Sequence, residues 1–458
     1  MKTDDVKDVK KAKEASVFTE MYLMFLETIK PVVRSIYKLQ KIRVGMGNSI
    51  VINFKKKMGM DLTIKEDDGD NKENREAKKM LKILREQFKR IADGVIIKKD
   101  MIDDILLEKS HERVRWQKTM DAIKENVNIM EEESKSSKTP VPIISNDVEF
   151  QLMKEYEDMV TLEENQFKHL DKLLMAHFPI YSEFLKNVNQ VGPAIGGILI
   201  SEIDIEKTDK FSKLLSYCGL DVAQDGRGRS RRKEHQVVRE YKDKNGKMQT
   251  KDSITFNPLL KPKLIGVLAS NLHRGDKNPI IKTKSPYIKV YEDYLHRLEN
   301  HPFYKDLPLT NEEAVEYLNN MIPIWKEMSS HVTIVTEGRQ AGMTRTPIQA
   351  YYAEVAEEMV ASMTTGCKKK ETDKVQIVTS VHLNKKKKMT RSRMADRYMV
   401  KMFLKDFWIA YRLIAGLPVT STYEEAKLGM LHHNATALEN FFKRYPFMEK
   451  YRTDMLVA

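Results

Sequence analysis

The residues with the greatest capacity for chemistry form a basic stretch at positions 225–233, which reads DGRGRSRRK. Arginine guanidinium groups bind phosphate oxygens as a fork, and the interspersed glycines would let the backbone lie close to a nucleic-acid strand. The stretch therefore predicts contact with DNA or RNA, although a charge run is often only a solvated surface. The predicted contact residues are Arg227, Arg229, Arg231, Arg232 and Lys233.

Ser230 lies inside this stretch, between Arg229 and Arg231. A serine nucleophile needs its Oγ close to the scissile phosphate, with a base or a metal ion beside it. The two flanking arginines could stabilise the charge of such a phosphate. Ser230 is therefore the candidate catalytic residue, and a phosphate hydrogen-bond donor or a plain loop residue are the alternatives.

A Val-Gly-Pro turn at 191–193 predicts a second phosphate contact. Gly192 is expected to free the turn, and Pro193 suits the first position of a helix because its φ is already helical. The unpaired N–H groups of a helix N-terminus attract an anion, typically a phosphate. Helix-hairpin-helix elements hold nucleic-acid backbones in this way, without reading bases.

Two further glycines, Gly196 and Gly197, fall inside the predicted second helix. Each costs about 1 kcal/mol relative to alanine, so something is expected to approach closely, either the neighbouring helix or a phosphate. A helical turn with glycines for packing alone is the alternative. The apolar frame at helical spacing consists of Val188, Val191, Ile195, Ile198 and Leu199, followed by Glu202.

Basic residues farther along the chain predict additional contacts. A helix is expected from Leu259 to Leu272, C-terminal to the basic stretch. The lysine run 385–393 precedes a helix with a basic edge, which indicates a second nucleic-acid contact rather than a disordered tether or a localisation signal. The candidates from these segments are Asn257, Lys261, Arg391, Arg393, Arg397 and Lys401.

Several linked motifs resemble the C-terminal transposase domain of the DEDD insertion-sequence transposases, the family called "one-ten". They are VGPxxGGILISEI at 191–203, DKFSKLLSYCGL at 209–220, the Arg-rich loop, and NPLLKPKL at 257–264. The resemblance covers roughly residues 180–275, with weaker similarity at 36–54 and 391–417. It implies a DNA-binding helix-hairpin-helix domain that acts in transposition or recombination.

The chain departs from this family at positions that matter for catalysis. Gln190 stands where the family has the first hairpin glycine, and Asp225 stands where it has a serine thought to form a phosphoserine link. The family also has an N-terminal RuvC-like domain, in which four carboxylates hold two metal ions. No strand-borne aspartate of that type is recognisable here, so the sequence predicts no metal site and leaves catalytic activity uncertain. The acids considered and interpreted as solvated are Asp67, Asp68, Asp70, Asp103, Asp104 and Glu108.

Composition agrees with a nucleic-acid partner. The 458 residues carry 79 Lys and Arg against 66 Asp and Glu, a formal net charge of +13, which attracts phosphate over long range. Cys218 and Cys367 are far apart, which supports neither a disulfide framework nor a zinc site. No apolar run long enough for a membrane span is present. We therefore expect a cytoplasmic or nucleoid-associated protein with no membrane contact and no identifiable cofactor.

Hydrophobic periodicity predicts a mainly α protein. A first helix is expected to be kinked or split by Pro31 and to end near Gly45 and Gly47, before a strand or buried helical turn at 49–54. A polar loop is expected at 61–74, an amphipathic helix from Ala77, and a long helix at 150–177. The last helix suits either packing within the chain or a dimerising coil, so a homo-oligomer is one expectation.

The expected organisation has four parts: a helical N-terminal region at 1–130, a linker at 131–148, the transposase-like helix-hairpin-helix domain at 149–300, and a helical C-terminal region with the basic run at 301–458. Three functions remain open. The first is a transposase-derived DNA-binding protein, with a guide RNA as a further partner to consider. The second is an active recombinase that uses Ser230 or a partner subunit's carboxylates. The third is an architectural or RNA-binding protein with the same phosphate contacts.

Overall fold

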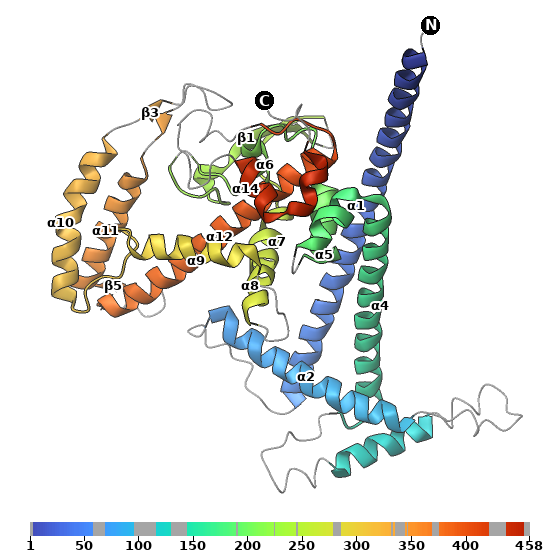
Figure 1. Cartoon of the computed structure of the whole chain (residues 1–458). Helices are drawn as coiled ribbons and strands as arrows, with labels where there is room; N and C mark the ends of the chain where they lie inside the picture. The colour runs from blue at the N-terminus through green and yellow to red at the C-terminus, as the bar shows by residue number, and fades with distance from the viewer. Residues whose placement is uncertain are drawn as a thin grey trace, which may run out of the picture. The chain divides into compact units, whose positions relative to one another are not determined.

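The computed structural model describes residues 3–57, 69–95, 116–129, 144–188, 191–223, 225–243, 246–277, 285–330, 333–334, 344–345, 347–368, 375–420 and 437–452. These residues are mainly α-helical, as Figure 1 shows, and the predicted fold class is confirmed. The strands that the structure describes form short antiparallel pairs: β1 (Val237–Lys242) with β2 (Met248–Ser253), β3 (Thr333–Ile334) with β4 (Thr344–Arg345), and β5 (Cys367–Lys368) with β6 (Val375–Gln376). Within the described residues, no helix has the length and apolarity to cross a membrane.

The chain divides into two compact units. One is Thr28–Lys172, and the other combines Met1–Glu27 with Leu173–Ala458. The division falls inside two long helices, α1 (Thr3–Lys57) and α4 (Asp147–His177), and not at the expected linker 131–148. Each of these helices runs unbroken through the point of division. Residues 131–143 of the expected linker lie outside the described part of the chain.

The unit Thr28–Lys172 is built from parts of α1 and α4, α2 (Gly69–Val95) and a helix at 116–129. The amphipathic helix predicted from Ala77 and the helix predicted at 150–177 are both confirmed. The predicted loop 61–74 is too long, because α2 already begins at Gly69. The buried core includes Ile50, Val51, Phe54, Leu84, Ile91, Phe150, Met153 and Tyr156.

α1 runs without interruption through the positions expected to break it. Pro31 lies inside the helix, where burial of Ile29 and Val33 offsets the lost backbone hydrogen bond. Gly47 lies against α4, because a Cβ added there would be 3.1 Å from Cε2 of Tyr156. The segment 49–54 is therefore a buried helical turn, which was one of the two predicted alternatives.

Buried and half-buried ion pairs connect the helices of this unit. Glu163, which is buried, accepts hydrogen bonds from Gln40 at 3.0 Å and from Arg43. Arg85 of α2 pairs with Glu157 of α4. α4 thus uses its apolar face within the chain, as the intrachain alternative predicted.

The second unit is organised around α12 (Ser380–Ile414), whose C-terminal half is almost entirely buried. Phe403, Phe407 and Trp408 have at most 1% of their surface exposed. Figure 1 shows α9 alongside α12. The elements that contact α12 include α6 (Phe211–Cys218), α8 (Ala269–Lys277), α9 (Pro286–Glu299), α14 (Ala437–Arg444), the π-helical turns Ile180–Phe184 and Leu264–Leu268, and the 3-10 helix Pro446–Tyr451.

A buried polar network joins three of these helices. Asp406 of α12 is fully buried and accepts hydrogen bonds from the Tyr287 hydroxyl at 2.9 Å and from Arg444 at 2.6 Å. Burial raises the pKa of Asp406, while the charge of Arg444 opposes that rise. A charge this deep is retained only when it is paired, so the network fixes α9 and α14 against α12.

α10 (Asn311–Ser329) and α11 (Ile348–Thr364) form a helical hairpin, which Figure 1 shows as two adjacent helices. Its aromatic core includes Phe303 and Tyr352, whose rings stack at 4.2 Å. Pro347 is the N-cap residue of α11, whereas Pro323 lies inside α10. The hairpin supplies two side chains to the basic loop described below.

Candidate nucleic-acid interface

The predicted helix start at Pro193 is confirmed. A π-helical turn at Ile180–Phe184 and a 3-10 turn at Leu185–Asn187 lead to α5 (Pro193–Glu202), with Pro193 at its first position. Gly192 is the N-cap with φ −91° and ψ −175°, an extended conformation open to any residue. An added Cβ would meet nothing within 4 Å, so the expectation that the turn needs glycine for its conformation is wrong.

The glycines inside α5 serve packing. A Cβ on Gly196 would lie 2.5 Å from Cε2 of Tyr181, so the glycine allows α5 to approach the preceding π-helical turn. Gly196 and Gly197 are both buried. Of the two alternatives for these residues, the neighbouring helical segment is correct for Gly196, and burial makes both unsuitable as phosphate contacts. The predicted apolar frame is buried at Val188, Val191, Ile195, Ile198, Leu199 and Glu202.

The segment 219–233, which contains the basic stretch and is here called the basic loop, begins where α6 ends. An internal ion pair fixes its shape. Gly219 closes α6 with φ +67°, in the left-handed region that favours glycine. Arg229 Nε lies 2.8 Å from both carboxylate oxygens of Asp221, and its Nη1 donates to Thr255 at 3.0 Å. Arg229 is 9% exposed, so its prediction as a phosphate contact is wrong: its guanidinium folds the loop.

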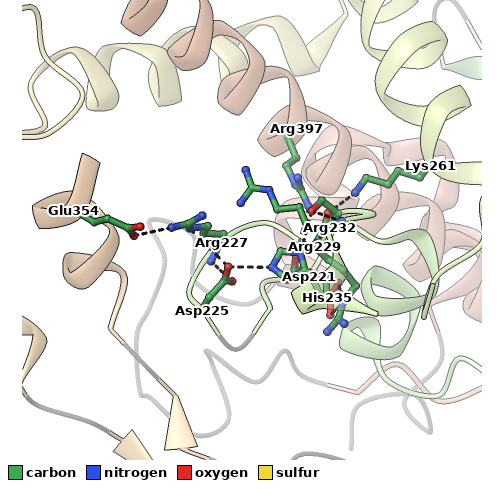
Figure 2. Close-up of polar contacts among 10 residues, drawn as sticks. Asp221, Asp225, Arg227, Arg229, Arg232, His235, Lys261, Glu354 and Arg397 are labelled. Carbon is green, nitrogen blue, oxygen red and sulfur yellow. Dashed lines mark hydrogen bonds and ion pairs between the residues drawn. The ribbon is translucent and has the colours of Figure 1, made fainter. Parts of the chain in front are cut away.

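Arg227 connects the loop to α11, as Figure 2 shows. Its guanidinium carbon lies 4.0 Å from the centre of the Tyr351 ring, and its Nη2 donates to Glu354 at 3.1 Å. A cation stacked on a ring and paired with a carboxylate is already neutralised. Arg227 therefore does not act as the free phosphate contact that was expected.

Arg397 reaches the loop from α12. Its Nη2 donates to the carbonyl oxygens of Gly219 at 3.1 Å and Asp221 at 3.4 Å. A Cβ on Gly228 would lie 2.6 Å from Nη1 of Arg397, so this glycine allows the arginine, and not a duplex, to approach. Burial lowers the pKa of Arg397, and the charge of Asp221 opposes that fall. The predicted surface contact at Arg397 is instead an internal clamp.

Lys261 and Asn257 also face the protein. Lys261 donates to the carbonyl oxygen of Arg229 and lies 4.6 Å from the centre of the Phe256 ring. Burial, and then the charge of Arg397, lower the pKa of Lys261 to about 8. Lys261 was expected at the nucleic acid, but it holds the loop in place.

Asn257 caps α7 (Leu260–Lys263) through its side-chain oxygen, which accepts from the N–H groups of Leu259 at 2.9 Å and Leu260 at 3.1 Å. Its Nδ2 donates to Glu202 at 2.9 Å. Glu202 ends α5, whereas Gly192 lies at the opposite end, roughly 14 Å away along the helix axis. Asn257 is therefore a helix cap that binds the C-terminal end of α5. Lys261, in the helix that Asn257 caps, is the residue that contacts the basic loop.

Three consecutive cations of the loop remain on the surface: Arg231, Arg232 and Lys233, here called the basic turn. All three are exposed, and within the described residues no carboxylate pairs with their side chains. The turn is held from beneath, because Gln236 Nε2 donates to the carbonyl oxygen of Arg231 at 2.7 Å. Their exposure leaves them accessible to a phosphate, and their role as nucleic-acid contacts stays a prediction.

Ser230 begins a chain of hydrogen bonds that passes through His235 and ends at Asp225. Its Oγ and its backbone N each lie 3.0 Å from Nδ1 of His235, whose Nε2 lies 3.0 Å from Oδ2 of Asp225. Because the backbone N–H must donate to Nδ1, the ring proton belongs on Nε2 and points at Asp225. Nδ1 is then a hydrogen-bond acceptor for Ser230.

Asp225 is held ionised in this chain. Burial alone would raise its pKa, but hydrogen bonds from His235 and from the Arg227 N–H outweigh burial and lower it. His235 itself is only 5% exposed. Figure 2 shows His235 and Asp225 joined beneath the loop. The buried His235 thus connects the half-buried Ser230 and Asp225, and the three residues support the basic turn.

The basic run at the start of α12 is divided between two faces. Lys387 Nζ donates to the carbonyl oxygen of Phe303 at 2.9 Å, and burial lowers its pKa to about 8. Arg391 donates to the Tyr304 carbonyl at 2.7 Å and is 3% exposed, so its assignment as a nucleic-acid contact is wrong. The exposed members of the run are Lys385, Lys386, Lys388 and Arg393; Lys401 is half-buried.

The described part of the chain contains no cluster of three or more His, Cys, Asp or Glu side chains that could hold a metal ion. Asp67, Asp68, Asp103, Asp104 and Glu108 lie outside it, whereas Asp70 is in α2. Cys218 is buried, which raises the pKa of its thiol and makes it inert.

Sequence reasoning missed the acids and the histidine that organise the loop. Asp221 pairs with Arg229, and Glu354 pairs with Arg227, two of the arginines predicted to bind phosphate. His235, five residues after Ser230, forms a hydrogen bond with it. The short spacing of Ser230 and His235 was a visible signal, whereas the partner of Arg227 on α11 was not. Comparison of the chain with protein-family models, curated proteins and solved structures finds no match in any of the three.

Proposed function

We propose that this chain is a nucleic-acid-binding protein, with duplex DNA as its principal partner, and that the basic turn binds the phosphate backbone. The observation that carries the proposal is the exposure of Arg231, Arg232 and Lys233 on a loop whose other cations are all engaged by the protein. Adjacent free cations have a strong electrostatic attraction to a polyanion, and phosphate is the group that guanidinium forks match best.

The inward-facing residues support the proposal by fixing the loop before binding. Arg229 is paired with Asp221, and Lys261 and Arg397 donate to loop carbonyl groups. A loop already ordered loses little conformational entropy when it binds a ligand. The net charge of +13 adds long-range attraction for DNA.

The order of motifs that resembles the one-ten transposases supports a role in DNA transposition or recombination, and association with the nucleoid would follow from such a role. The phosphate contact that we propose differs from that of a helix-hairpin-helix. In this account the basic turn binds the phosphate backbone, and the N-terminus of α5 is not required for binding. A guide RNA would be a second ligand for the same cations.

The test compares the affinity of the full chain for duplex DNA, single-stranded DNA and structured RNA at one salt concentration. The variant Arg231→Ala, Arg232→Ala and Lys233→Ala removes the basic turn. A control with Lys385→Ala, Lys386→Ala and Lys388→Ala removes the same charge from exposed positions on α12. Circular dichroism of both variants verifies the fold.

We expect the basic-turn variant to lose most of its affinity for duplex DNA and the α12 control to lose much less. Equal losses in the two variants would show that the basic turn contributes no more than the lysine run of α12 or than net charge, and would overturn the proposal. Tighter binding of structured RNA than of duplex DNA, lost in the same variant, would make the protein an RNA-binding one.

A second candidate function, DNA strand transfer through Ser230, is favoured by the hydrogen bonds from Ser230 to His235 and from His235 to Asp225. In such a step, Oγ would attack a phosphodiester while its proton passes to Nδ1, and the ionised Asp225 would stabilise the imidazolium. The displaced sugar hydroxyl would take a proton in exchange. The shared backbone donor on Nδ1 favours the structural interpretation, which keeps this function second.

The second candidate is tested by incubating the chain with supercoiled DNA, magnesium and co-purified RNA. Denaturing gels then reveal nicks or a covalent protein–DNA species. The binding proposal predicts neither product. A covalent species that disappears in Ser230→Ala, with DNA affinity retained, would establish strand transfer.

A further inference from the structure

The ribbon formed by β1 and β2 stands out because almost none of it is covered. Every residue of β1 is exposed, and so is every residue of β2 except the half-buried Ser253. A two-stranded ribbon on its own is only marginally stable in water. Large apolar side chains are exposed nonetheless, among them Val238 at 67% and Met248 at 58%. A ribbon of this kind is typical of a surface that a partner covers.

Backbone and side-chain hydrogen bonds join the two strands of the ribbon at the described residues of its turn, Asp243, Gly246 and Lys247. Asp243 N donates to the Lys247 carbonyl at 3.0 Å, and Lys247 N donates to the Asp243 carboxylate at 2.9 Å. Gly246 takes φ +76°, a left-handed conformation that closes such hairpins. The turn therefore fixes the strand register.

That register separates the ribbon's charges onto two faces. Arg239 is directly opposite Lys251, and Tyr241 is opposite Gln249, so these four side chains share one face. This donor face contains two cations and no carboxylate. The other face holds Glu240, Lys242 and Asp252, together with Val238, Met248 and Thr250.

Two cations directly opposite each other destabilise an isolated ribbon. Within the described residues, no carboxylate is paired with Arg239 or Lys251. An anionic partner between them would remove this repulsion. The basic turn precedes β1 by only a few residues, so the donor face continues the positive charge of the proposed phosphate contact.

We propose that the donor face of this ribbon enters the major groove of duplex DNA, and this inference rests on the proposed function. The major groove of B-form DNA is wide enough for a two-stranded ribbon, and Arg, Lys and Gln are the side chains that donate to its base edges. Each six-residue strand extends about 20 Å, which is also the length of about six base pairs. The major groove of an RNA duplex is too narrow for side chains to read.

The ribbon offers a matched pair of variants. Lys251→Ala removes one exposed lysine from the donor face, and Lys242→Ala removes one exposed lysine from the opposite face. The fold should tolerate both, because neither side chain is buried. Arg239→Ala is a second variant on the donor face.

The experiment is a methylation-interference assay on a pool of short random-sequence DNA duplexes, with the full chain. Methylation of guanine N7 places a methyl group in the major groove, on an acceptor that arginine and lysine use. We expect methylated guanines to be depleted from DNA bound by the unaltered chain and by Lys242→Ala. We expect the depletion to disappear in Lys251→Ala and Arg239→Ala, with affinity lower by roughly 5-fold or more.

Failure of this inference is distinguishable from failure of the proposed function. If the basic-turn variant loses DNA affinity while Lys251→Ala behaves like Lys242→Ala, the phosphate contact stands and the groove contact is refuted. Equal affinity for an RNA duplex, with the same dependence on Lys251, would also refute the major-groove assignment. If the basic-turn variant binds normally, the proposed function itself fails.

Discussion

Gly192 and Gly196 provide a direct test of whether the α5 glycines contact a ligand or the protein. The sequence predicted a phosphate at Gly192, and either a phosphate or the neighbouring helix at Gly196, yet only Gly192 has room for a side chain. A Cβ on Gly196 would lie 2.5 Å from Cε2 of Tyr181, whereas a Cβ on Gly192 meets nothing within 4 Å. Substituting each glycine by serine adds the same atoms in the two environments.

The magnitudes follow from these environments. Serine is a better helix former than glycine by about 0.5 kcal/mol, but overpacking a buried site costs about 1–3 kcal/mol. Gly196→Ser should therefore lower the free energy of unfolding by about 1–2 kcal/mol. Gly192→Ser should leave it unchanged or raise it by a few tenths of a kcal/mol, because serine is a preferred N-cap residue and φ is already extended.

The assay is urea denaturation followed by circular dichroism, together with DNA affinity measured under conditions in which each variant is folded. We expect folded Gly196→Ser to bind DNA normally, and Gly192→Ser to bind normally as well. Weaker binding by Gly192→Ser with unchanged stability would refute the reasoning, since the new hydroxyl would then be competing with a phosphate for the N-terminal N–H groups of α5.

Two further predictions concern the basic run of α12. The pKa of Lys387 is about 8 in the folded chain, against an ordinary value of 10.5, so the unfolded state binds more protons between these pH values. The free energy of unfolding should therefore rise by about 3 kcal/mol from pH 8 to pH 10.5. In denaturant titrations at these two pH values, Lys387→Met should not show this rise. Arg391→Ala should lower the free energy of unfolding by about 1–3 kcal/mol, because it removes a hydrogen bond to the Tyr304 carbonyl and an ion pair with Asp306, whereas exposed Arg393→Ala should change it by less than about 0.5 kcal/mol; equal effects would contradict the inward orientation of Arg391.

Helices with strong periodicity were predictable from the sequence. α4, α2 and the start of α5 at Pro193 follow from apolar spacing and proline position, which act locally. Breaks at Pro31 and Gly45 were not realised, because packing of neighbouring residues outweighs local propensity in a long helix. The ribbon was missed because its strands bury nothing and show no apolar–polar alternation.

The site was only partly predictable. The sequence identifies a cluster of cations but does not show which of them the protein neutralises. Arg227 pairs with Glu354, which is distant in sequence. Arg391 donates to the backbone carbonyl of Tyr304, a contact that no residue pattern predicts. By contrast, the exposed positions 231–233 follow one another directly and have no acid beside them except Glu234. Their predicted contact with nucleic acid stays a prediction that their exposure allows.

The measurement that tests the central claim most directly is the salt dependence of duplex DNA affinity. Each phosphate neutralised contributes about −0.9 to the slope of log affinity against log salt concentration, so the three cations of the basic turn contribute about −2.7. The account predicts that Arg231→Ala, Arg232→Ala and Lys233→Ala together make the slope shallower by about that amount. A slope identical to that of the unaltered chain would show that these residues do not contact phosphate and would contradict the account.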